Sequence, residues 1–330
     1  MSANNKNQNL TNLASPKIGT KIIEVSDDFF GEASRMLDDK EPVFIEDKYD
    51  EHGKWMDGWE SKRRRDGGND WAIIELGSPG IITEIDIDTS FFTGNFPPFA
   101  SIEGLYSDQK PSKDSDWIEI LSKTSLNGDC GNKFRIDSKT KVNYIKLQIF
   151  PDGGVARLRL FGEVKLNWDN YDNKNDLIEL SSLKLGGSIV AYNNAHYGDV
   201  SALLSHGRGK TMGDGWETRR RREPGNDWII IKLATRGLIK KIEIDTAHFK
   251  GNYPDQASVQ VSNFDKNKGL EELINESHNW KYILDKSKLQ ADNIHNYEVN
   301  DTSIKGVTHV RLNIYPDGGV SRLRIFGIKL

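Results

Sequence analysis

Cysteine is almost absent from this sequence, since Cys130 is the only one in 330 residues. A single thiol excludes a disulfide framework within the chain and fits a reducing compartment. No apolar run approaches the roughly 18 residues that a membrane-spanning helix needs. The net charge of −4 offers no general attraction for nucleic acid or an anionic membrane. Because the polar start MSANNKNQNLTN does not resemble a signal peptide, we expect a cytoplasmic globular protein.

Several familiar site motifs are also missing. The sequence has no Walker loop, no Gly-x-Ser-x-Gly elbow and no dinucleotide fingerprint. Its seven histidines do not show the spacing of a metal site. We therefore predict no metal site and no cofactor. A divalent cation held through water by carboxylates is the alternative that stays open.

Two long segments, in contrast, each occur twice. DGWESKRRRDGGNDW at 57–71 matches DGWETRRRREPGNDW at 214–228 in 11 of 15 positions, at an offset of 157. PDGGVARLRLFG at 151–162 matches PDGGVSRLRIFG at 316–327 in 10 of 12 positions, at an offset of 165. Polar residues match as well as apolar ones. We predict an internal duplication, and these segments are the first place to seek a functional site.

The duplication divides the chain into domains of ordinary size. We predict a disordered tail at 1–12, a first repeat at 13–166, a linker at 167–176 and a second repeat at 177–330. The change in offset places about ten extra residues of the first repeat between 37 and 57. It places about eight extra residues of the second between 251 and 315, most plausibly at 265–279. Both insertions are loop-like in composition.

Apolar residues alternate with polar ones in short stretches. In 83–89, Ile85 and Ile87 face one way while Asp86 and Asp88 face the other, and 143–150 and 157–161 alternate in the same manner. This period of two is typical of strands with one buried face. Short strands between Gly, Asn, Asp and Pro turns predict all-β, antiparallel sandwiches. Helical patterns are sparse, with short helices expected at 28–37 and 199–205.

The Asp-Gly-Trp-Glu block brings carboxylates and guanidinium groups close together. The carboxylates are Asp57, Glu60, Asp214 and Glu217, and arginines follow at 63–65 and 220–222. Arginine offers a planar fork that grips a carboxylate or a urea-like group. The block is too polar for a core strand, so we expect a loop at the sandwich edge, where sites usually lie. The competing interpretation is an arginine–carboxylate network that holds the two domains together.

The other repeated motifs have both structural and functional interpretations. Gly-Asn-Asp-Trp, at 68–71 and 225–228, is best read as a turn followed by a core tryptophan. Pro-Asp-Gly-Gly-Val predicts a tight turn whose second glycine permits close approach of a ligand. The arginines that follow it, at 157, 159, 322 and 324, require an anionic partner, and strand aspartates such as Asp86, Asp88 and Asp245 are candidates. The second copy has His248 where the first has Phe91. If only one copy is catalytically active, this histidine indicates that it is the second.

These motifs together resemble the allantoicase family. The resemblance rests on Asp-Gly-Trp-Glu-x-x-Arg-Arg, Asp-Thr-x-x-Phe-x-Gly-Asn and Pro-Asp-Gly-Gly-Val-x-Arg-x-Arg-x-Phe-Gly, each present twice, and covers about Leu13 to Leu330. It implies two tandem jelly-roll β-sandwiches of the galactose-binding type. It also implies hydrolysis of allantoate to ureidoglycolate and urea, in purine degradation and nitrogen recycling. Ser61-Lys62 in place of Thr218-Arg219 is a mild departure between the copies.

The chemistry of allantoate fits these residues. Its central carbon carries a carboxylate and two ureido groups, so a site needs a cationic clamp, an acid/base group and amides. The catalytic candidates are Asp214, Glu217, His248, Asp57 and Glu60. The substrate-binding candidates are Arg220, Arg221, Arg322, Arg324, Asn226, Asn252, Arg63 and Arg64. One site in each repeat and a single site that spans both are equally compatible with the sequence.

The alternative function is a non-catalytic tandem sandwich that binds carbohydrates or other small ligands. Trp59 and Trp216 would then be stacking platforms, and the arginines would be structural. A further alternative makes the repeated blocks mere domain-interface residues without a ligand. We expect allantoate as the partner, no nucleic acid and no membrane, and self-association is left open.

Overall fold

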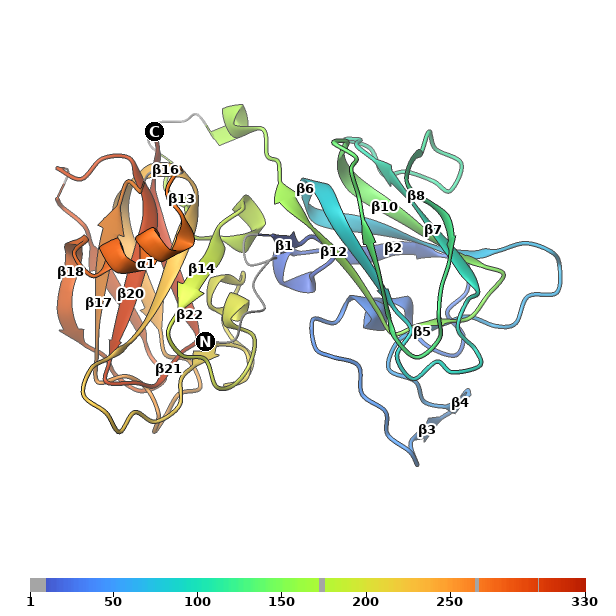
Figure 1. Ribbon diagram of the computed structural model, residues 1–330, viewed down its shortest axis with the longest axis horizontal. Coiled ribbons are helices and arrows are strands. Elements are labelled where there is room, and N and C mark those ends of the chain that lie inside the picture. The colour runs from blue at the N-terminus through green and yellow to red at the C-terminus, as the bar shows by residue number, and fades with distance from the viewer. Residues whose placement is uncertain (1–9, 172–175, 265–266, 302) are drawn as a thin grey trace. The chain divides into compact units, whose positions relative to one another are not determined.

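The computed structural model describes residues 10–171, 176–264, 267–301 and 303–330. The chain forms two compact units, repeat 1 from Leu10 to Leu166 and repeat 2 from Asn167 to Leu330 (Figure 1). Most of the predicted tail, and residues 172–175 of the predicted linker, lie outside the described residues. Thr11 and Asn12 form a strand of repeat 1, so this part of the predicted tail is wrong.

Both repeats are built almost entirely from strands. The strands of repeat 1 are β1 (Thr11–Asn12), β2 (Lys21–Val25), β3 (Tyr49–Asp50), β4 (Gly53–Lys54), β5 (Trp59–Glu60), β6 (Asp70–Asp88), β7 (Phe99–Leu105), β8 (Ile118–Ser125), β9 (Gly131–Arg135), β10 (Lys141–Phe150), β11 (Gly154–Val155) and β12 (Arg157–Val164). Those of repeat 2 are β13 (Ile178–Glu179), β14 (Ser188–Tyr192), β15 (Trp216–Glu217), β16 (Asp227–Asp245), β17 (Gln256–Ser262), β18 (Lys281–Lys288), β19 (Ile294–Glu298), β20 (Val307–Tyr315), β21 (Gly319–Val320) and β22 (Arg322–Lys329).

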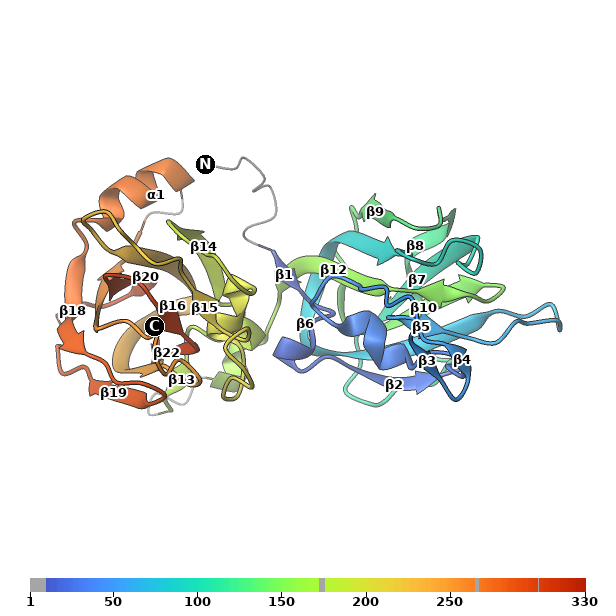
Figure 2. The ribbon, with the colours of Figure 1, turned by 90° about the horizontal axis from the view of Figure 1, so that it is seen from below.

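Each repeat is an antiparallel jelly-roll β-sandwich, as the resemblance implies. In repeat 1 the order is β1-β12-β6-β10-β7-β8, with β2 and β9 also paired to β6. Repeat 2 has the equivalent order β13-β22-β16-β20-β17-β18, with β14 and β19 paired to β16. Seen from below in Figure 2, the strands of repeat 2 surround a common interior.

The long strand β6 serves both layers of its sandwich. Its first half pairs with β2 and β10, and its second half with β9 and β12. Asp70 at its start donates its backbone N–H to Pro151 O, and Asp88 O at its end accepts from Ala156 N. Both ends of β6 therefore lie beside the turn at 151–156. Strand β16 does the same with the turn at 316–321.

The interior confirms the period-two pattern, but the prediction of a single buried face is wrong near this turn. Ile85 and Ile87 are fully buried, and burying such side chains stabilises by roughly 1.5–3 kcal/mol each. On the opposite face Asp88 and Arg157 are only 5% and 1% exposed. The loop at 35–57 covers that face, because Arg157 donates to the carbonyls of its residues. Hydrophobic periodicity contains no signal for such a polar cover.

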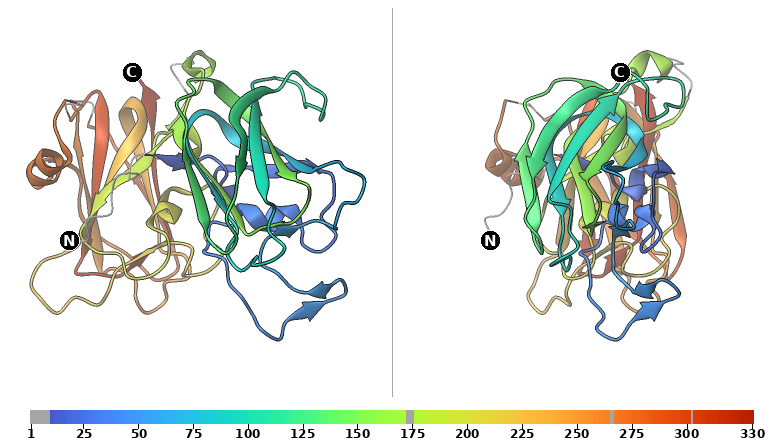
Figure 3. Two further views of the ribbon diagram at one scale, coloured as in Figure 1. Left: turned by 45° about the vertical axis from the view of Figure 1, so that its right-hand side comes forward. Right: turned by 90° about the vertical axis from the view of Figure 1, so that its right-hand side faces the viewer.

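Both predicted insertions are present, although neither is a plain loop. Val43 N and Lys210 N donate to the equivalent Asp57 Oδ2 and Asp214 Oδ2, so the extra residues of repeat 1 lie at 44–56. They contain the β3–β4 hairpin, which projects from the repeat 1 sandwich in Figure 3. The first residue of β17 lies 157 positions after that of the equivalent β7, whereas β18 begins 163 positions after the equivalent β8. The extra residues of repeat 2 therefore lie largely between β17 and β18. The intervening segment includes the helix α1 (Leu270–Ser277), which the sequence analysis missed.

The two predicted short helices are 3-10 turns. Ala33–Leu37 and Val200–Leu204 form single short turns whose apolar side chains, apart from Val200, are buried. The predicted helix at 28–37 therefore begins too early. Further 3-10 turns lie at Pro16–Ile18, Trp168–Tyr171 and Leu183–Leu185. Within the described residues, no helix has both the length and the apolar character needed to cross a membrane.

Buried His309 makes repeat 2 sensitive to acid. The side chain is 9% exposed, and burial, followed by the charge of Lys232, lowers its pKa to about 4. A histidine in the unfolded chain has a pKa of about 6.5, so the unfolded state takes up the proton first. We expect the free energy of unfolding to fall by up to about 3 kcal/mol as pH falls from 6.5 towards 4. Denaturant titration at pH 7 and pH 4.5 measures it, and His309→Gln should remove this part of the loss.

Candidate active site

Three repeated motifs meet at one end of each sandwich. In repeat 1, β5 pairs with β11, and Ser61 N donates to Gly153 O at 3.2 Å. Gly154 N donates to Asn95 O at 2.7 Å, which joins the Gly-Asn bend to the same turn. Repeat 2 has the equivalent bonds, from Thr218 N to Gly318 O and from Gly319 N to Asn252 O. The Trp-Glu strand, the Pro-Asp-Gly-Gly turn and the Gly-Asn bend therefore form one unit in each copy.

A glutamate–asparagine pair lies at the centre of this unit. Asn95 Nδ2 donates to Glu60 Oε1 at 2.7 Å, and Asn252 Nδ2 donates to Glu217 Oε1 at 2.5 Å. Both glutamates are half-buried. Burial raises the pKa of Glu60; the bond from Asn95 opposes this shift, and the charge of Asp50 adds to it. A half-buried carboxyl group held by an amide is suited to proton transfer.

The doubled glycine serves packing inside the protein and not the approach of a ligand. Gly153 has φ +139°, in the region that favours glycine, and lies against the backbone of Asn95. A Cβ on Gly154 would overlap the ring of Phe92, which is fully buried. Repeat 2 repeats both features at 318 and 319. The predicted close approach of a ligand to the second glycine is therefore wrong.

The arginine run points partly outward and partly inward. Arg63 and Arg220 are exposed. Arg64 turns inward: its backbone N donates to Asp152 Oδ2 at 2.7 Å, and its Nη1 donates to Asp70 Oδ1 at 2.5 Å. The same contacts join Arg221 to Asp317 and Asp227, at 2.8 and 2.7 Å. The inward arginine thus links the run to the Pro-Asp-Gly-Gly turn and to the start of a core strand.

The first aspartate of the block, Asp57 or Asp214, is held by a buried arginine of the same repeat. Arg322, 2% exposed, donates to Asp214 Oδ2 at 3.0 Å, to Asp214 O at 2.7 Å and to Gly207 O at 3.0 Å. Arg157 holds Asp57 in the same way, with Nη2 2.7 Å from Oδ2. These contacts fasten the covering loop onto the sheet. The aspartate–arginine pairs are thus separate from the Glu–Asn unit, and each pair lies within its own repeat.

Arg324 and Asn226 also have partners within repeat 2. Arg324 Nη1 donates to both carboxylate oxygens of Glu179, at 3.0 and 3.1 Å, and its Nε lies 3.2 Å from Glu243. Asn226 Nδ2 donates to Asp227 O at 2.9 Å, which fits the predicted turn.

The tryptophan after this turn is only half-buried in either copy. Trp59 and Trp216 are the fully buried ones, so the prediction of a core tryptophan at 71 and 228 is wrong.

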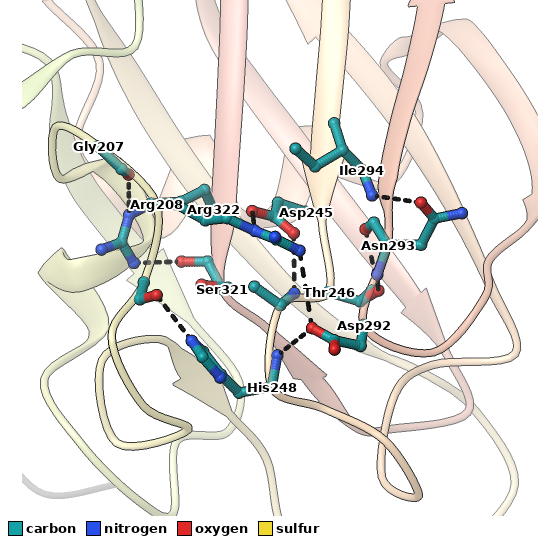
Figure 4. A network of polar contacts seen from close by, with 12 residues as sticks. Gly207, Arg208, Asp245, Thr246, His248, Asp292, Asn293, Ile294, Ser321 and Arg322 are labelled. Carbon is teal, nitrogen blue, oxygen red and sulfur yellow. Dashed lines mark hydrogen bonds and ion pairs between the residues drawn. The ribbon is translucent and has the colours of Figure 1, made fainter.

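His248 lies in a polar network at the end of β16 (Figure 4). Its Nε2 is 2.7 Å from Gly209 O, and because a carbonyl only accepts, Nε2 carries the proton. Its backbone N donates to Asp292 Oδ1 at 2.9 Å. Arg208 lies between Asp292 and Asp245, 3.6 and 3.3 Å from their oxygens. The histidine therefore steadies the 207–214 loop, as do Asp214 and Arg322.

Sequence reasoning missed three kinds of carboxylate. Asp152 and Asp317 were treated only as turn residues, and Asp70 and Asp227 as parts of an Asn-Asp turn. Asp66, just after the arginine run, was not considered. All were visible as acidic residues within or beside a repeated motif.

In the described residues, no group of three or more His, Cys, Asp or Glu side chains is placed to hold a metal ion.

Comparison with known proteins identifies relatives along nearly the whole chain. The family model described as allantoicase repeat matches residues 11–165 and 178–330. A protein of Burkholderia mallei named probable allantoicase 1 is 48% identical over 317 residues, which cover 96% of this chain and 94% of the relative. A probable allantoicase of Acinetobacter baumannii is 47% identical, covering 96% and 93%. The crystal structure of allantoicase from Saccharomyces cerevisiae has a TM-score of 0.82 at 35% identity, covering 98% and 94%.

Proposed function

The chain belongs to the allantoicase family, and we infer that it hydrolyses allantoate to ureidoglycolate and urea. The observation that carries this inference is the match of both repeats to the family model, together with 48% identity to a relative over 96% of the chain. The protein is accordingly a hydrolase that acts on a linear C–N bond.

The reaction makes specific demands on a site. One C–N bond of the central carbon breaks, and the leaving nitrogen takes up a proton to form urea. The remaining nitrogen supports an acylimine-like intermediate. Water then adds its hydroxyl group to that carbon and returns a proton. The site must hold the carboxylate, donate and recover one proton, and orient two ureido arms.

The Glu–Asn unit is the best-placed group for the proton transfers. Glu217 accepts a hydrogen bond from Asn252 through one oxygen, which leaves its second oxygen for a substrate nitrogen or water. Asn252 donates through Nδ2, so its own Oδ1 can accept from a ureido N–H. The arginine run, in which Arg221 N donates to Asp317 of the turn, supplies positive charge for the carboxylate. Asp57, Asp214, His248, Arg322, Arg324 and Asn226 have a structural role in this proposal.

The alternative of a carbohydrate-binding module loses its main support in the structure. Trp59 and Trp216 are 0% exposed, and each indole donates to a backbone carbonyl, at Asp27 and Asn194 respectively. A buried indole offers no face on which a sugar could stack.

Allantoate is therefore the proposed partner, without nucleic acid or membrane. A cytoplasmic location and catalysis without a cofactor are parts of the proposal that rest on sequence, and self-association is left open.

The proposed function predicts urea release from allantoate. Purified protein should form one urea and one ureidoglycolate for each allantoate consumed, and prior treatment with EDTA should leave the rate unchanged. Coupled detection of urea, with glyoxylate measured separately after breakdown of ureidoglycolate, checks the stoichiometry. Absence of urea with and without added divalent metal would contradict the proposal, whereas loss of activity with EDTA would contradict only its metal-free form.

A further inference from the structure

The inward arginine of repeat 1 holds a carboxylate that belongs to the protein itself. Arg64 Nε donates to Asp66 Oδ1 and Nη2 donates to Asp66 Oδ2, both at 3.0 Å. This is the bidentate geometry in which arginine binds a free carboxylate. Gly68 N donates to the same Oδ1 at 3.0 Å. These bonds lower the pKa of Asp66 to about 2, with the Arg64 bond as the largest cause. Asp66 therefore caps the fork of Arg64 as an anion.

In repeat 2 no described side chain caps the Nε atom of the equivalent arginine. Arg221 makes the same pair with the buried carboxylate of Asp227 through Nη1. Its Nε is buried and, among the described residues, has no hydrogen-bond partner. The Arg221 side chain is 22% exposed, and the exposed residues Glu223 to Gly225 run beside it. A buried cationic donor without a partner is costly for a folded protein, so its retention calls for a functional or structural reason.

The copies differ at two neighbouring positions of this segment, Asp66 against Glu223 and Gly67 against Pro224. Asp66 folds back onto Arg64 because Gly67 takes φ +77°. Pro224 stands at the equivalent position, and its ring fixes φ near −65°. The preceding residue is also pushed towards extended conformations by the proline. Glu223 therefore cannot repeat the fold-back of Asp66. Instead its carboxylate lies 3.9 Å from Arg219 Nη2, and the backbone N–H groups of Glu223 and Arg222 are the largest causes that lower its pKa.

We propose that the Nε–Nη2 edge of Arg221 is the subsite for the substrate carboxylate, and that Asp66 blocks the equivalent subsite in repeat 1. The ligand carboxylate takes the position relative to Arg221 that Asp66 has relative to Arg64, while the exposed 223–225 segment moves outward. Asp317 accepts from the Arg221 backbone N–H and so joins the backbone of this arginine to the turn of the Glu–Asn unit. Each chain then has one working site, in repeat 2. The identity of the carboxylate rests on the proposed function.

N-carbamoylglycine is a suitable probe because it has a carboxylate and one ureido arm but lacks the second ureido group that would leave as urea. Calorimetric titration of the whole protein should give one site per chain. Arg221→Gln should weaken binding at least about 30-fold, as expected for loss of a bidentate charged contact. Arg64→Gln is the matched control: it removes the same pair with a buried aspartate, yet it should leave the Kd unchanged.

Two further variants test the cap and leave both arginines in place. Glu223→Asp combined with Pro224→Gly copies the cap of repeat 1 into repeat 2 and should weaken probe binding. Asp66→Ala opens the fork of Arg64 and should raise the stoichiometry from one site per chain to two. Carbamoylglycinamide, which lacks the negative charge, should bind wild type and Arg221→Gln equally weakly.

Several results would overturn the inference. For the wild-type chain, these are two probe sites or no probe binding at all. For the arginine variants, they are an unchanged Kd in Arg221→Gln or an equal rise in Kd in Arg64→Gln and Arg221→Gln. For Asp66→Ala, the contradicting result is a stoichiometry of one site per chain. None of these measurements depends on turnover. Failure of the proposed function would appear separately, as absence of urea release from allantoate by wild-type protein that still binds the probe at Arg221.

Discussion

Replacement of Glu217 by glutamine is expected to lower kcat for urea release about 10²- to 10⁴-fold, the usual contribution of a positioned acid/base group. Glutamine has nearly the same shape as glutamate. Its Oε1 can still accept from Asn252 Nδ2, the bond that holds Glu217 at the centre of the site. The variant should therefore fold normally and lose only the proton transfer. Steady-state rates at saturating allantoate, with melting temperature as the folding check, measure the effect.

Glu60→Gln is the matched control for this prediction. Glu60 accepts from the equivalent asparagine, Asn95, and burial raises its pKa, which would suit a proton donor. If Asp66 blocks repeat 1, however, this group has no substrate to serve, and kcat should stay within about twofold of wild type. A normal kcat in Glu217→Gln would remove Glu217 from the mechanism. A large loss in Glu60→Gln alone would assign the chemistry to repeat 1.

Arg322→Met is expected to lower the free energy of unfolding of repeat 2 by about 2–4 kcal/mol, because the half-buried carboxylate of Asp214 and several carbonyls lose their donor. Arg322 is 2% exposed and donates to Asp214 and to the carbonyls of Gly207 and Ser321. Methionine fills much of the space but satisfies none of these acceptors. The 207–214 loop should lose its attachment to the sheet. Denaturant titration, followed by tryptophan fluorescence, measures the loss.

Two comparisons make this prediction specific. Arg220→Met places the same residue at an exposed position and should change the free energy of unfolding by no more than about 0.5 kcal/mol. Arg157→Met should destabilise repeat 1, whose unfolding transition Arg322→Met should leave in place because each repeat has its own core. A change of under 1 kcal/mol in Arg322→Met would show that the contacts of this arginine contribute little to the free energy of unfolding.

The strands were predictable because the local pattern reports burial directly. Alternation at Ile85 and Ile87 identified a strand, and the identical motifs identified the duplication. The same reasoning failed where cover comes from distant sequence. Asp88 and Arg157 look solvent-exposed by periodicity, but a loop some hundred residues earlier in the chain covers Arg157. No local pattern encodes such a cover.

The site was predictable in composition and less so in geometry. The sequence brought Glu217, Asn252 and the arginine run into one candidate set, and the structure places these residues at the same end of repeat 2. It could not distinguish Arg221, which turns inward, from its exposed neighbour Arg220. The doubled glycine was misjudged because its partner, the ring of Phe249, lies about seventy residues away in the sequence. Side-chain direction within a polar loop depends on contacts of this kind.

The pairing of β1 with β12 has a consequence for how such a protein can arise. Thr11 lies opposite Gly162, so the first and last strands of a repeat are neighbours in the same sheet, and Ile178 and Gly327 repeat this arrangement. A repeat whose two ends meet is complete before the next begins. A second gene copy can then be joined in frame by a short connector without breaking any strand pairing of the first. Once joined, the copies are free to diverge, as the pairs Asp66/Glu223 and Gly67/Pro224 illustrate.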